Sequence, residues 1–100
     1  MDADIQNILE ALIKNDLAAP RVPKERVPKL RQIWKCQHAS DFLYGHRVGY
    51  YKGLAEGIIL ERYHRKLSNE EDNEIFELVD LYTKALRKYF SYYKDKRTKN

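Results

Sequence analysis

The sequence predicts an all-α protein, and three features support this prediction. Apolar residues recur at spacings of three and four through most of the chain, which is the period of an amphipathic helix. The three prolines all fall between positions 20 and 28, and from about Lys29 to Leu67 nothing forces a helix to stop. The four glycines lie four residues apart inside one such periodic segment, rather than between segments. We expect residues 1–100 to form one helical domain, with a short N-terminal helix, a Pro-rich connector and a long antiparallel helical hairpin.

The first helix is expected over residues 4–17, where apolar side chains share one face. These side chains are Ile5, Ile8, Leu9, Leu12 and Ile13. Residues 18–28 are expected to form a stiff connector, because its prolines lack backbone donors and hold the preceding residues extended. Pro28 suits the first turn of the helix that follows.

A long helix is expected over residues 29–67, with one apolar stripe that keeps its phase from Leu30 to Ile58. The stripe is interrupted by polar residues at positions 37, 40 and 41, so a break near Ser40 is the alternative. Leu30, Ile33 and Trp34 extend beyond the expected hairpin partner, and either the N-terminal helix or a second subunit has to cover them.

The last helix is expected over residues 69–94, and it begins with a capping box. Ser68 can accept a hydrogen bond from the amide of Glu71, whose side chain can reach back to the amide of Ser68. Apolar residues then follow in a heptad-like stripe up to Tyr93. The short link before Ser68 predicts that the two long helices are antiparallel neighbours. Residues 95–100 are expected to be a basic tail.

The glycine repeat needs a physical reason, because glycine costs about 1 kcal/mol relative to alanine inside a helix. Four glycines therefore cost about 4 kcal/mol, a large part of the stability of a small domain. Three interpretations compete. Aromatic side chains of the last helix could cover the glycines, a helix of another molecule could pack there, or the segment could be a membrane GxxxG dimer. The third is excluded by the charges of Arg47, Lys52 and Glu56.

We favour an interface for another helix, because the glycine face is rotated away from the apolar stripe. This predicts a non-enzymatic assembly or adaptor module that forms a homo-oligomer or binds a partner helix. The expected interface residues are Gly45, Gly49, Gly53, Gly57, Phe42 and Leu60. The repeat resembles those of the flagellar export regulator FliH and of iron–sulfur adaptor proteins. The resemblance covers 13 of 100 residues, and it implies only that such a repeat serves helix–helix assembly.

The alternative function is nucleic-acid binding, because two basic segments are expected to meet at one end of the hairpin. Residues 21–35 hold six basic residues and one acidic residue, and residues 87–99 mix six basic residues with four aromatic ones. Such residues can neutralise phosphates and stack on bases. The expected contacts are Arg21, Lys24, Arg26, Lys29, Arg31, Arg87, Lys88, Tyr92, Lys94, Lys96 and Arg97.

Catalytic and metal-binding patterns are weak in this sequence. Glu61 and His64 have the spacing of half of a di-iron site, but the chain has no second Glu-x-x-His. Cys36 and His38 alone are too few for a zinc site. We therefore expect no enzyme and no cofactor. A single cysteine, the absence of a long apolar run and an acidic N-terminus favour a cytoplasmic protein that does not enter membranes.

Overall fold

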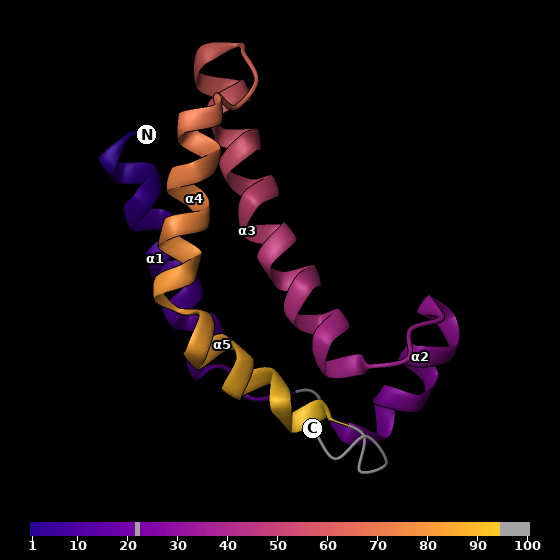
Figure 1. Ribbon diagram of the computed structural model, residues 1–100. Helices are drawn as coiled ribbons and strands as arrows, with labels where there is room; N and C mark the ends of the chain where they lie inside the picture. The colour runs from indigo at the N-terminus through magenta and orange to yellow at the C-terminus, as the bar shows by residue number, and fades with distance from the viewer. Residues whose placement is uncertain (22, 95–100) are drawn as a thin grey trace.

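The computed structural model describes residues 1–21 and 23–94, and the expected basic tail at 95–100 lies outside this part of the chain. The described residues form helices and turns without a strand, so the predicted all-α class is confirmed (Figure 1). The helices are α1 (Ala3–Ala18), α2 (Val27–Trp34), α3 (Ala39–Tyr63), α4 (Asn69–Leu81) and α5 (Thr83–Phe90). Two 3-10 turns are η1 (Lys24–Arg26) and η2 (Ser91–Tyr93).

Helix α1 is amphipathic and packs against α3, α4 and α5. Its fully buried side chains are Ile5, Leu9 and Ile13, which recur every four residues and so lie on one face. Polar contacts reinforce this packing at the edge. The hydroxyl of Tyr82 donates to Glu10 at 2.5 Å, and Arg62 forms an ion pair with Asp4 at 2.6 Å.

The continuous helix expected over residues 29–67 is divided into α2 and α3. Lys35 ends α2 in the left-handed conformation, with φ of 54°, and the amide of Cys36 donates to the carbonyl of Arg31 at 3.3 Å. His38 is extended before α3 begins. The interruption therefore precedes Ser40 by a few residues, in the polar region where the sequence offered a break as the alternative. Helix α2 itself starts within the expected connector, which also contains η1.

The change of direction between α3 and α4 is built from local interactions. His64 takes a left-handed conformation that ends α3, earlier than the expected position 67. The capping box then forms as predicted, because Ser68 and Glu71 each accept from the other's backbone amide. Arg65 adds two hydrogen bonds to Glu71, at 2.7 and 3.1 Å. Arg65 and Ser68 together lower the pKa of Glu71 to about 2.

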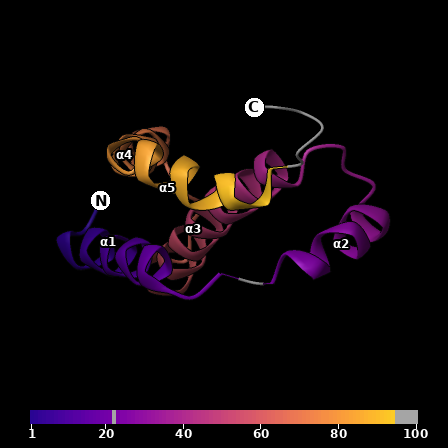
Figure 2. The same cartoon turned by 90° about the horizontal axis from the view of Figure 1, so that it is seen from below.

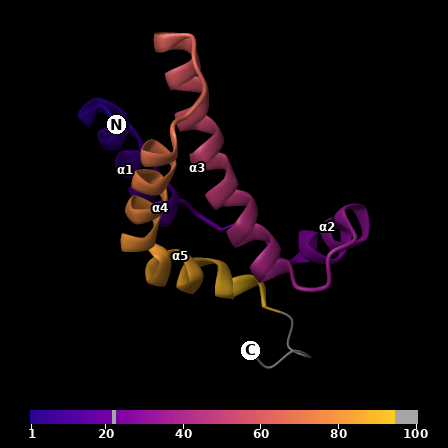
Figure 3. The same ribbon diagram turned by 45° about the horizontal axis from the view of Figure 1, so that its top comes forward.

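The expected helix 69–94 bends at Tyr82 into α4 and α5 (Figure 3). The amide of Tyr82 bonds the carbonyl of Val79, three residues back, and the hydroxyl of Thr83 donates to the same carbonyl. Side-chain bonds of this kind bend helices.

Helices α4 and α5 both pack along α3. An ion pair joins Lys52 to Asp72 at 3.2 Å, and another joins Asp41 to Arg87 at 3.6 Å. The earlier pair partner on α3, Asp41, thus meets the later residue Arg87 of α5, whereas Lys52 meets Asp72 of α4. The buried residues of these three helices that complete the core are Ala39, Tyr51, Ala55, Ile59, Ile75, Val79, Leu86 and Phe90.

Helix α2 stands apart from α1, with the connector running between them (Figure 2). Consequently α1 does not cover the apolar residues of α2. Ile33 and Trp34 remain 62% and 58% exposed, whereas Leu30 is half-buried.

Candidate functional site

The four glycines of α3 lie on an exposed face of the helix, which we call the glycine face: Gly45, Gly49, Gly53 and Gly57. Beyond the adjacent residues and the nearby backbone of α3, a Cβ atom added at any of them would meet no atom of the described chain within 4 Å. None of the four has a positive φ. Neither close packing nor backbone conformation within the described chain therefore requires glycine at these positions. In particular, the aromatic residues of α4, α5 and η2 do not cover them.

Apolar side chains lie at both ends of the glycine face. At one end Phe42 is half-buried, and its ring centroid lies 5.7 Å from that of Trp34 and 6.0 Å from that of His46. At the other end Leu60 is 56% exposed. The six residues that the sequence predicted as an interface thus share one side of α3, with Trp34 of α2 beside them.

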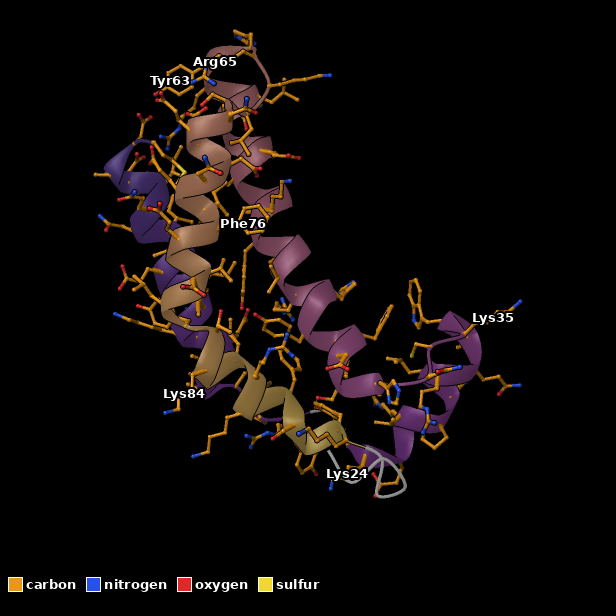
Figure 4. All side chains as sticks on the ribbon, viewed as in Figure 1. Lys24, Lys35, Tyr63, Arg65, Phe76 and Lys84 are labelled. Carbon is orange, nitrogen blue, oxygen red and sulfur yellow. The ribbon has the colours of Figure 1, made fainter. Side chains whose placement is uncertain are left out.

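The two basic segments meet around Tyr89 and Tyr92. The guanidinium of Arg21 donates to the carbonyl of Tyr89 at 3.1 Å and lies over the rings of both tyrosines. The ammonium of Lys24 lies 4.5 Å from the ring centroid of Tyr92. Figure 4 places Lys24 at the end of the molecule where the described chain finishes.

A polar hollow of about 390 Å³ lies beside Tyr92. Lys24, Arg31 and Lys94 supply its charged groups, while Tyr92 and Tyr93 supply aromatic walls. Tyr92 is exposed and Tyr93 is buried, so only Tyr92 presents a ring that could stack on a nucleic-acid base. We call this group of residues, together with Arg21, the basic pole.

The other predicted nucleic-acid contacts are more scattered. Arg87 is held against α3, with its guanidinium 4.2 Å from the ring centroid of Tyr44 and in an ion pair with Asp41. Lys29 and Lys88 are exposed on α2 and α5. Arg26 lines a different cavity. Lys96 and Arg97 lie outside the described residues.

Glu61 and His64 do not form the di-iron half-site that their spacing suggested, because they do not both lie within a helix. The spacing of three places side chains on one face only inside a helix, whereas His64 lies beyond the end of α3 in a left-handed conformation. Within residues 1–21 and 23–94, no three His, Cys, Asp or Glu side chains are grouped closely enough to hold a metal ion.

The sequence did not indicate a second cavity, of about 230 Å³, enclosed by the connector, α2, α3 and α5. Beside it, the hydroxyl of Tyr51 donates to Asp16 at 2.7 Å, and Arg47 forms an ion pair with the same carboxylate at 3.6 Å. Burial, followed by the bond to Asp16, raises the pKa of Tyr51. Arg47 and Tyr51 are one turn apart on α3, whereas Asp16 lies 35 residues before Tyr51, so no local pattern could have revealed the contact of Asp16 with them.

Comparison of the chain with models of protein families, with curated proteins and with solved structures finds no match. Among the helices that the structure describes, none is long and apolar enough to cross a membrane.

Proposed function

We propose that this protein is a non-enzymatic assembly module in which two copies pack through the glycine face of α3. The observation that carries the proposal is the open space outside all four glycines. Their cost of about 4 kcal/mol is not offset by packing or by backbone conformation within the described chain. A second helix offsets it, because missing side chains let two helix backbones approach closely.

The spacing of the glycine face suits a two-fold symmetric pair. If two copies of α3 cross antiparallel at the level of residue 51, then Gly45 faces Gly57 and Gly49 faces Gly53 of the second copy. The same pairing brings Phe42 level with Leu60. These two residues are 18 positions apart, which is five turns at 3.6 residues per turn, so they point in the same direction from the helix. One patch is thus complementary to itself.

Exposed apolar side chains beside the glycine face add area that such a contact would bury. Tyr50 is 46% exposed and Leu60 is 56% exposed, both on α3, and Trp34 is 58% exposed on α2. Burial of apolar surface is the main driving force of association between proteins.

Light scattering after size exclusion, over a series of protein concentrations, tests this function. We expect twice the 12.0 kDa mass of one chain for the native protein. Gly49→Leu and Gly53→Leu should each return the mass to one chain while keeping the helical circular dichroism. Lys84→Leu is the matched control, because it adds the same side chain to an exposed position of α5 (Figure 4). A native protein that stays at 12.0 kDa throughout overturns the proposal, and so does a dimer that neither glycine variant disturbs.

The basic pole favours a second candidate function, the binding of single-stranded nucleic acid. Its support is the contact between segments about 70 residues apart, which gathers cations beside the exposed ring of Tyr92. Cations bind phosphates, and an aromatic ring stacks on bases regardless of their sequence.

Mobility shift with a single-stranded oligonucleotide at several salt concentrations tests this candidate. The affinity should fall as salt rises, and Lys24→Gln with Lys94→Gln should weaken it and flatten the salt dependence. Lys84→Gln removes one charge away from the pole and should change little. Absence of any shift at low salt overturns the candidate.

A further inference from the structure

The cavity of about 230 Å³ has an apolar interior. Leu86, at 1% exposure, and Phe90, at 9%, belong to the core, while Leu30 and Leu43 close the cavity from α2 and α3. Helix α2 approaches α3 only through a few residues, so the cavity lies where the packing of the main helices ends. Its lining is mostly apolar with a few polar groups, which is typical of small-molecule sites.

Three charged side chains line the cavity, those of Asp16, Arg26 and Arg47, and they differ in the interactions they make with the rest of the protein. The carboxylate of Asp16 is engaged by the hydroxyl of Tyr51 and by Arg47. The guanidinium of Arg47 is 3.6 Å from one oxygen of Asp16, a distance too long for a good hydrogen bond. The backbone amide of Arg26 donates to the carbonyl of Pro23, but its exposed guanidinium makes no hydrogen bond or ion pair with any residue of the described chain. The cavity lining therefore contains two guanidinium groups, those of Arg26 and Arg47, and one carboxylate, that of Asp16.

We infer that this cavity binds a small apolar monocarboxylate, with its hydrocarbon part against Leu43, Leu86 and Phe90 and its carboxylate held by Arg26 and Arg47. A guanidinium offers paired N–H donors that match the two oxygens of a carboxylate. Asp16 balances the positive charge of one of the two arginines, and the carboxylate of the ligand would balance the other. A neutral apolar ligand would leave one positive charge unbalanced, and a dianion would add one negative charge too many.

The size of the cavity limits the ligand. A cavity of about 150 Å³ lined by apolar side chains holds a benzene molecule. The present one, at about 230 Å³, is larger and accommodates a short aliphatic chain, such as that of octanoate.

The cavity and the glycine face lie on different sides of α3. At 100° per residue, Arg47 lies roughly 140° around α3 from the middle of the glycine face. The guanidinium of Arg47 also lies 5.1 Å from the ring centroid of Tyr50, which borders the glycine face.

Isothermal titration calorimetry of the full chain with octanoate tests the inference, with octanol and acetate as the two reference ligands. We expect saturable binding of one octanoate per chain, and at least tenfold weaker binding of octanol, which lacks the charge, and of acetate, which lacks the chain. Arg26→Gln should weaken octanoate binding about tenfold. Lys29→Gln removes one positive charge from α2, three residues after Arg26 and outside the cavity, and should leave the affinity unchanged.

A second variant, Leu43→Trp, fills the cavity and should abolish binding, with circular dichroism to verify that the fold is kept. Three results would overturn the inference: no saturable binding of octanoate, equal affinity for octanol, or an affinity that Arg26→Gln leaves unchanged. If Leu43→Trp fails to fold, Arg26→Gln against Lys29→Gln still decides, because both change only exposed side chains.

Discussion

Replacing Gly49 and Gly53 together by alanine should make the folded chain more stable and its assembly weaker. Each added methyl group enters open space, because no described atom outside the adjacent residues and the nearby backbone of α3 lies within 4 Å of its position. Both residues have helical backbone angles that alanine adopts without strain. Alanine is favoured over glycine by about 1 kcal/mol inside a helix, so the double variant should gain about 2 kcal/mol in free energy of unfolding.

Urea denaturation followed by far-ultraviolet circular dichroism measures this gain, at a concentration where light scattering shows a single chain. For a domain of this size, about 2 kcal/mol raises the thermal midpoint by about 8–16 °C. At concentrations where the native protein is a dimer, the same variant should show weaker association, because the two methyl groups hold the helix backbones apart. A variant that loses stability as a single chain would refute the reasoning, since the glycines would then be required by the fold itself.

Three further changes test contacts inside the fold, all by urea denaturation. Ser68→Ala removes the helix cap and should lower the free energy of unfolding by about 1 kcal/mol, whereas Ser91→Ala, which caps no α-helix start, should cost less. Glu71 has a lowered pKa in the folded state, so its stabilisation is complete above the ordinary value of 4.5 and is lost as the pH falls toward about 2; the difference between native protein and Glu71→Gln should shrink over that range, and a constant difference would contradict this linkage. Tyr51→Phe removes the hydrogen bond to Asp16 and should cost about 1 kcal/mol, and an unchanged stability would show that water replaces the hydroxyl.

Local patterns predicted the features that depend on neighbouring residues. The capping box at Ser68 formed because both partners lie within one helical turn. The core face of α1 follows from the spacing of Ile5, Leu9 and Ile13, which places them on one side of any helix. The outward position of the glycines likewise follows from their angle relative to the apolar stripe.

Local patterns were insufficient where two conformations differ little in free energy. The segment between Arg31 and Ser40 keeps enough helical periodicity for one long helix, yet the chain turns at Lys35 in a left-handed conformation. The bend at Tyr82 was also not predicted from local spacing. It involves a hydrogen bond from the hydroxyl of Thr83 to Val79 and one from Tyr82 to Glu10 of α1, which is distant in the sequence.

The sequence by itself determined that this protein is helical, that Ser68 caps α4 and which helix face carries glycine, because these properties arise from residues within a turn or two of one another. Only the tertiary structure decided that α1 packs on α3, α4 and α5, that Arg21 reaches Tyr89 and that Arg26 and Arg47 line one cavity. Each of these depends on where α2 and α5 are directed after a break in the chain. A small change in backbone angles at Lys35 or Tyr82 moves every later residue, and no local spacing encodes that direction.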